Sequence, residues 1–225
     1  MLKRAAFFEC TNLTHVTLGK GITNIENCAF RSCRKLADVS IPDSVTRIGQ
    51  SAFSHCPALK SIKIPDSVQC IWSGAFCHCH SLTDITIPDS VEVIGLWAFK
   101  GCRSLKRVLL GNCVQSIGDR AFYDCSSLTD ISIPDSVTSI GECAFQGCKN
   151  LTSITIPDSV TDIGCRAFKE CSALKRIIIP DSVTSIGWYA FQDCTSLLRI
   201  MIPKHFTSKK VKQWGLPDTC EIIRY

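Results

Sequence analysis

The most reactive side chains of the sequence gather in one short segment, Cys77-His78-Cys79-His80. Thiolate and imidazole are preferred zinc ligands, and His55 lies 23 residues before His78. A structural zinc site needs four ligands that converge on one point as a tetrahedron. Residues 77–80 cannot all face one point without distorting the chain. We therefore expect surface histidines beside a core cysteine, with His55, Cys77, His78 and His80 as weak candidates for a metal site.

A second group of residues combines arginine with apolar side chains that are expected to be exposed. In three places an arginine stands two positions before a large apolar residue, and in two of these a lysine precedes the arginine. The group comprises Lys106, Arg107, Leu109, Lys175, Arg176, Ile178, Arg199 and Met201. Arginine next to exposed apolar side chains is typical of the centre of a protein interface. The pattern predicts a protein-binding patch, with ordinary variation of surface residues as the alternative.

Both groups are embedded in a repeat of 23 residues that runs through almost the whole chain. Leucine, the pair Ala-Phe and cysteine each recur at this interval. The leucines are Leu13, Leu36, Leu59, Leu82, Leu105, Leu128, Leu151, Leu174 and Leu197. Self-similarity at a fixed period of this length is the signature of a solenoid in which each coil packs on the next.

One repeat, residues 151–173, shows how a coil is expected to fold. Its first residues end in strict apolar alternation at Ile154 and Ile156, which predicts a short strand with one face inward. Pro157 cannot donate to a strand ladder, and Pro-Asp-Ser favours a turn. Val160 and Ile163 predict a second short extended segment. A glycine bend and a helical or 3₁₀ turn then close the coil.

The unit L-x-x-I-x-I-P-D-S-V-x-x-I-G-x-x-A-F-x-x-C stands nearly verbatim at 128–148, 151–171 and 174–194. It resembles the BspA-like (Treponema-type) leucine-rich repeat over roughly residues 2–203. The resemblance implies a leucine-rich-repeat solenoid, mainly β, with a parallel concave sheet of about ten strands. It also implies a surface or secreted adhesion or interaction protein rather than an enzyme.

The period divides the chain into two parts. Residues 1–203 form nine stacked repeats, of which the first is truncated, and residues 204–225 look like a degenerate tenth coil that acts as a C-terminal cap. Continuing the period places Phe206, Trp214, Ile223 and Tyr225 in the valine, phenylalanine, isoleucine and last strand positions. Because no polar cap precedes Leu2, the N-terminal edge could be covered by upstream repeats or by self-association.

Nine of the sixteen cysteines belong to the repeat. Equivalent side chains on neighbouring coils point the same way, about 4.8 Å apart, whereas a disulfide needs converging Cβ atoms. We expect buried free thiols, with paired disulfides along the column as the alternative. The other seven are Cys28, Cys70, Cys77, Cys113, Cys143, Cys165 and Cys220. Free thiols on this scale favour a reducing or anaerobic setting.

Other classes of function find little support in the sequence. Apolar residues make up 45% and charged residues 20%, as in folded proteins, and no apolar run is long enough for a membrane span. The first ten residues are too short for a signal peptide. A net charge of +5, with a basic run only at 204–212, does not indicate nucleic-acid binding. No nucleophile, acid and base recur together, and no phosphate or dinucleotide motif is present, so we expect neither catalysis nor a cofactor.

Two hypotheses follow for the function. The first is a non-catalytic binding and adhesion scaffold that recognises another protein or a cell-surface component on its concave face. The second is a structural spacer, one segment of a longer cell-surface repeat array without a ligand of its own. The arginine rows favour the first hypothesis, and the half coil at Leu2 favours the second or self-association. The sequence leaves the compartment open.

Overall fold

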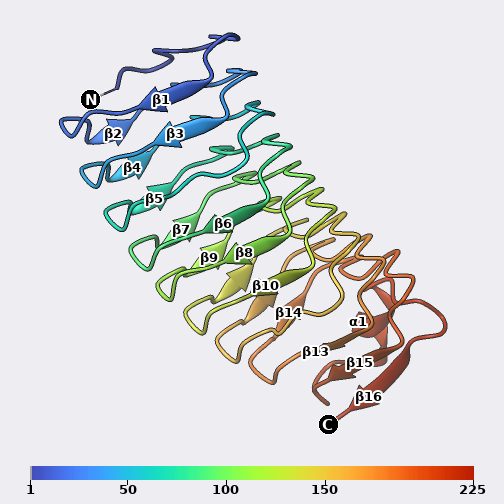
Figure 1. The fold of residues 1–225 in the computed structure, drawn as a ribbon. Helices are drawn as coiled ribbons and strands as arrows, with labels where there is room; N and C mark the ends of the chain where they lie inside the picture. Colours follow the sequence, from blue (N-terminus) through green and yellow to red (C-terminus); the bar gives the residue numbers. More distant parts are fainter. Residues whose placement is uncertain (1) are drawn as a thin grey trace.

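The structure is a computed structural model that describes residues 2–225. The chain winds as a stack of flat coils, with the two termini at opposite ends of an elongated solenoid (Figure 1). Every strand pair is parallel, because each strand meets its counterpart one coil further along the chain. The predicted leucine-rich-repeat solenoid is confirmed.

The first extended segments of successive coils line up in one row along the solenoid, which we call the ladder, and eight of them are strands. Its members are β1 (His15–Thr17), β3 (Asp38–Ser40), β6 (Asp84–Thr86), β8 (Arg107–Leu109), β10 (Asp130–Ser132), β13 (Arg176–Ile178), β15 (Arg199–Ile202) and β16 (Glu221–Arg224). The central residue of each three-residue strand points inward and its two neighbours point outward. We call the outward side of this ladder the ladder face; it is the face predicted to be concave.

The ladder is not one sheet of about ten strands, as the sequence suggested, but three separate groups. Strand β1 pairs only with β3, β6 to β10 form a three-stranded sheet, and β13 to β16 form another. The interruptions fall at residues 61–63 and 153–155, which have no strand assignment although Ile62 and Ile154 still point into the core.

The second extended segment of each coil forms a continuous sheet of eight two-residue strands. These are β2 (Asn24–Ile25), β4 (Arg47–Ile48), β5 (Cys70–Ile71), β7 (Val93–Ile94), β9 (Ser116–Ile117), β11 (Ser139–Ile140), β12 (Asp162–Ile163) and β14 (Ser185–Ile186). Figure 1 shows these strands running beside the first ladder along the length of the solenoid. The sequence predicted this segment, and the structure confirms it.

Glycine follows the second strand because the coils approach each other closely there. A Cβ atom on Gly187 would lie 2.3 Å from the backbone nitrogen of Cys165, and one on Gly95 would lie 2.7 Å from that of Ser73. Both distances are shorter than side chains tolerate, so a larger residue must displace the neighbouring coil. Glu26 and Trp72 are exceptions in this column.

The core is a stack of identical side chains. Phe30 and Phe53 lie parallel with ring centroids 5.2 Å apart, and the same arrangement continues to Phe168 and Phe191 at 5.6 Å. Eight of the nine repeat cysteines are buried, as predicted, and Cys10 in the first coil is exposed. Each buried thiol also donates to a phenylalanine carbonyl 26 residues earlier, for example Cys56 Sγ to Phe30 O at 3.1 Å. The cysteine therefore fills space and gives a second hydrogen bond to a carbonyl that already accepts from a backbone nitrogen, as Phe30 O does from Cys33 N.

The segment that closes each coil differs from the expected helical or 3₁₀ turn. Alternate residues make i→i+3 hydrogen bonds, such as Lys100 N to Trp97 O at 3.1 Å. The residues between them bond to the next coil, such as Phe99 N to Ala121 O at 2.8 Å. Positive φ angles at Trp97 (56°) and Gly101 (71°) prevent a helix from continuing. Within residues 2–225, the α-helix is confined to α1 (Ser208–Lys212), capped by the side chain of Thr207.

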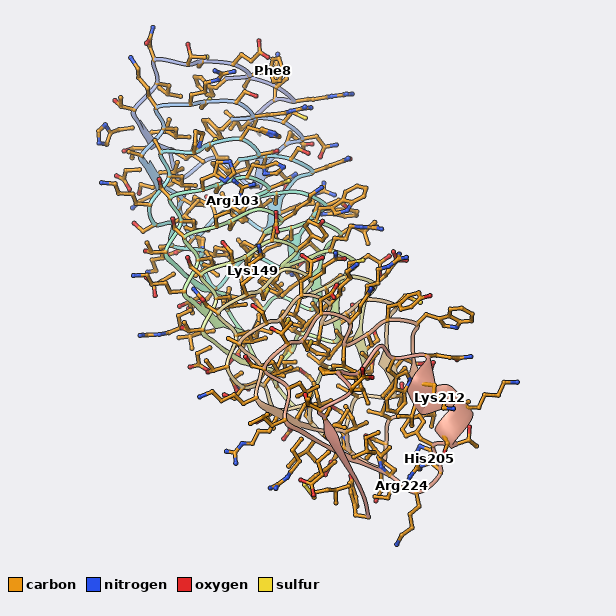
Figure 2. The ribbon with its side chains drawn as sticks, turned by 90° about the vertical axis from the view of Figure 1, so that its right-hand side faces the viewer. Phe8, Arg103, Lys149, His205, Lys212 and Arg224 are labelled. Atoms are coloured by element: carbon orange, nitrogen blue, oxygen red, sulfur yellow. The ribbon has the colours of Figure 1, made fainter. Side chains whose placement is uncertain are left out.

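The last coil closes the core with different residues. Phe206, Val211 and Trp214 are buried, and Trp214 meets Phe191 edge to face at 6.4 Å. Strand β16 aligns Ile222, not Ile223, with Ile200, so its register is 22 residues rather than 23. Figure 2 shows His205, Lys212 and Arg224 at this end of the solenoid, with α1 at one side of the last coils.

Candidate binding surface

The predicted patch divides into two parts on the ladder face. Arg176 pairs in register with Arg199, and Ile178 with Met201, so these four residues on β13 and β15 form one block. Lys175 lies immediately before β13 and is exposed. The other part, Lys106, Arg107 and Leu109 on and beside β8, belongs to a separate sheet with β10 and residues 153–155 in between.

The charges around the two parts differ. Arg107 stands in register between Asp84 and Asp130 on the strands to either side, although among residues 2–225 neither carboxylate lies within ion-pair distance of it. Arg199 Nε donates to Glu221 Oε2 at 2.8 Å. Arg176 has no acidic partner within ion-pair distance among residues 2–225. Arg176 is therefore the available cation of the block on β13 and β15.

A hollow of about 550 Å³ lies over this block. Its lining includes Ser153, Ile154, Thr155, Ile156, Asp158, Arg176, Ile178, Arg199, Met201 and Tyr225. The hollow falls at the second interruption of the ladder, where residues 153–155 make no strand. Ile178 leaves 53% of its surface exposed. Its neighbours in the repeat column offer less apolar surface, because Thr155 is smaller and Met201 is half-buried. The hollow thus combines apolar side chains with the guanidinium group of Arg176, which has no ion-pair partner among the described residues, and with the carboxylate of Asp158.

Tyr225 is a member of the hollow that the sequence did not identify. Its hydroxyl donates to the carbonyl oxygen of Ile179 at 2.7 Å, across 46 residues of chain. Burial, together with the charges of Asp181 and Asp158, raises the pKa of this hydroxyl. This hydrogen bond connects the end of the last coil to Ile179, the residue directly after β13. Because the period places Tyr225 one position out of register, no repeat pattern could have found it.

The histidine cluster lies on the segments that close the coils. The rings of His55 and His78 are 4.8 Å apart, and those of His78 and His80 are 5.5 Å apart. His80 Nδ1 lies 2.8 Å from the carbonyl oxygen of Gly101, and His55 Nδ1 lies 2.8 Å from the hydroxyl of Ser54. Cys77 is half-buried, and desolvation raises its pKa. Across residues 2–225, no three side chains of the metal-ligating types are placed to hold one ion.

The pKa values of His55 and His78 are lowered in the folded protein. Burial is the main cause that lowers the pKa of His55, and the charges of Arg31, His80 and Arg34 add to it. Burial is also the main cause that lowers the pKa of His78. The nearby charges of His55, His80, Lys100 and Arg103 lower it further. Protonation of this cluster would place several cations side by side.

Stacked coils, two parallel ladders and a leucine in each coil define a leucine-rich-repeat solenoid. The chain belongs to the family described as the BspA type leucine rich repeat region, whose model matches residues 1–128 and 115–214 in six copies. Members of this family are scaffolds that typically bind proteins or lie on surfaces. A comparison with curated proteins gave no match.

Solved structures support the same fold. A leucine rich repeat protein from Treponema pallidum is 31% identical over 92% of this chain and 86% of its own, with a TM-score of 0.67. A leucine-rich repeat protein from Bacteroides ovatus is 25% identical over 99% of this chain and 86% of its own, with a TM-score of 0.56. A leucine rich cell surface protein from Faecalibacterium prausnitzii is 28% identical over 95% and 79%, with a TM-score of 0.50. No helix in residues 2–225 is long and apolar enough to cross a membrane.

Proposed function

We propose that this protein is a non-catalytic adhesion scaffold, and that the hollow over β13 and β15 binds a carboxylate next to an apolar side chain of another protein. The observation that carries the proposal is the exposed pair Arg176 and Ile178. Arg176 is free of acidic partners among the described residues, while Ile178 and Met201 offer apolar surface beside it. An arginine fork binds a carboxylate through two hydrogen bonds, and adjacent apolar contact excludes water.

The setting that we propose is the cell surface. The relative from Faecalibacterium prausnitzii is described as a leucine rich cell surface protein. The sixteen free thiols suit an anaerobic exterior as well as a reducing interior. We further propose that residues 204–225 act as the C-terminal cap, because Phe206, Val211 and Trp214 cover the end of the core.

A matched pair of charge reversals tests the binding proposal. Random peptides displayed on phage would be selected on the wild-type protein, and the enriched peptides would then be measured on Arg176→Glu and on Arg107→Glu. Both arginines are exposed on the ladder face, but Arg107 lies outside the hollow between two aspartates. We expect enriched peptides with Asp or Glu beside an apolar residue, bound at least tenfold more weakly by Arg176→Glu and normally by Arg107→Glu. Peptides that bind Arg176→Glu as well as wild type would contradict the proposal.

The spacer function is the second candidate, and one observation favours it. Ile222 occupies the position of the fully buried Ile200 but leaves 44% of its surface exposed, so the stack retains apolar surface at β16. Such surface can pack against a further coil or a second copy of the chain. A light-scattering mass that stays monomeric at high concentration would argue against self-association, through this edge or the N-terminal one.

A further inference from the structure

Trp72, like Glu26 two coils earlier, departs from the rule that glycine follows the second strand. Gly49, Gly95, Gly118, Gly141, Gly164 and Gly187 hold the same position in six other coils. At Gly49 an added Cβ would lie 2.8 Å from the backbone nitrogen of Asn27, so side chains are costly in this column. Burial does not compensate for this cost at Trp72, because 48% of its surface is exposed. A locally unfavourable residue without a packing reward is typical of a binding site.

The indole of Trp72 separates two hollows beside the second sheet. One hollow, of about 230 Å³, is lined by Glu26, Asn27, Arg47, Gly49, Gln50 and Trp72. The other, of about 410 Å³, is nearly all apolar; Val93 and Leu96, both largely exposed, are among its lining residues. Trp72 is the one residue that lines both hollows.

Most polar side chains of the smaller hollow have no partner within the described part of the chain, and Asn27 is the exception. Neither Glu26 nor Arg47 has an ion-pair partner within residues 2–225. The side-chain oxygen of Asn27 accepts from the backbone nitrogen of Gln50 at 2.9 Å, which fixes the Asn27 amide at the rim. A carboxylate, a guanidinium group and two amides therefore surround one face of an exposed indole.

We propose that this hollow binds a pyranose residue of a glycan. A pyranose has a ring of hydroxyl groups, which need donors and acceptors of both kinds, and an apolar face of C–H groups, which stacks on an aromatic ring. Glu26, Arg47, Asn27 and Gln50 supply the first requirement, and Trp72 supplies the second. The hollow is smaller than the roughly 300–1,000 Å³ of sites for drug-sized ligands, which suits a single sugar ring. The adjoining apolar hollow offers Val93 and Leu96 to an acetyl methyl group on the next sugar.

A protein side chain in the apolar hollow is the competing occupant. An apolar hollow alone would favour it, but an apolar segment gives no reason for the unpaired side chains of Glu26, Arg47 and Gln50 on the other side of the indole. The saccharide accounts for both sides of Trp72.

Two oligosaccharides and two tryptophan variants test the proposal. Chitotetraose and cellotetraose share one backbone linkage and differ in the acetamido groups, so we expect both to bind and chitotetraose to bind more tightly. Saturation-transfer NMR and titration calorimetry would measure binding by the full chain. Trp72→Gly restores the residue found in six other coils, so it should fold normally. We expect it to bind chitotetraose at least tenfold more weakly, because glycine leaves the sugar ring without an aromatic surface to stack on.

The control is Trp188→Ala, which removes an equally exposed tryptophan far along the chain from the hollow. It should bind chitotetraose as the wild type does, and so should Arg176→Glu, which keeps this test separate from that of the ladder face. The proposal is overturned if neither oligosaccharide binds wild type, or if Trp72→Gly binds as tightly as wild type. It is also overturned if Trp72→Gly loses binding of selected peptides while no saccharide binds.

Discussion

The inward and outward sides of the same strands follow opposite rules. Inward, β8 and β10 both place a branched apolar residue at their centre, and the phenylalanines behind them stack from Phe7 to Phe191 without interruption. Outward, the same two strands carry Arg107 and Leu109 on one and Asp130 and Ser132 on the other. The repeated interior makes each coil a template for its neighbour, while the varied exterior gives each coil its own chemistry. Binding specificity in this solenoid is therefore confined to the outward residues.

The largest difference in stability is expected between an inward phenylalanine and an outward serine, each replaced by alanine. Phe122→Ala removes a fully buried ring that contacts Phe99 and Phe145, and we expect the free energy of unfolding to fall by about 3–5 kcal/mol. Ser132→Ala, on the outward side of β10, should change it by less than about 0.5 kcal/mol. Urea denaturation of both variants measures the difference. Comparable losses would mean that the interior stack does not dominate stability.

Two glycine substitutions would show whether glycine is needed because neighbouring coils approach closely or only because it lies in a turn. Gly187→Ala forces a Cβ into the backbone of Cys165, and we expect a loss of about 1–3 kcal/mol, as for other overpacked sites. Gly19→Ala meets nothing within 4 Å and should leave the free energy of unfolding nearly unchanged. Equal effects in thermal denaturation would show that the coils are further apart than described.

The histidine cluster should give the smallest effect, a modest dependence of stability on pH. The pKa values of His55 and His78 are lowered in the folded state, so the unfolded chain binds more protons as pH falls below about 6.5. Stability contributed by these groups is present above that pH and is lost as pH falls through the lower, folded pKa values. Denaturation at pH 7.5 and 5.5 should show a decrease that shrinks in a His55→Gln, His78→Gln variant. An increase on acidification would contradict this explanation.

The features that the sequence predicted correctly are those that depend on residues repeated every 23 positions. Solenoid winding, both extended segments and the buried cysteine column all follow from residues that recur at fixed spacing. The interruptions at 61–63 and 153–155 were not predictable, because Leu59 and Leu151 begin coils of the ordinary pattern. The closing turn was expected to be helical, but its left-handed residues include types as different as Trp97 and Arg120, so composition gives no signal.

The candidate sites show the same limit. The sequence identified Arg176, Ile178, Arg199 and Met201, because they depart from their columns, and the structure places them together. It could not show that Glu221 balances Arg199, because β16 pairs out of the 23-residue register. Trp72 stands where most coils have glycine, but the hollows beside it depend on side chains from several coils.

Thiol labelling, read by mass spectrometry, tests the central claim most directly, namely that repeated residues point inward in every coil. Burial raises the pKa of Cys56 and of Cys194 to about 12, and it also raises the pKa values of the column cysteines between them. In native protein at pH 8, iodoacetamide should modify the exposed Cys10 and Cys113 within minutes and leave the eight buried column thiols intact until the chain unfolds. Modification of the column thiols at the rate of Cys113 would contradict the account.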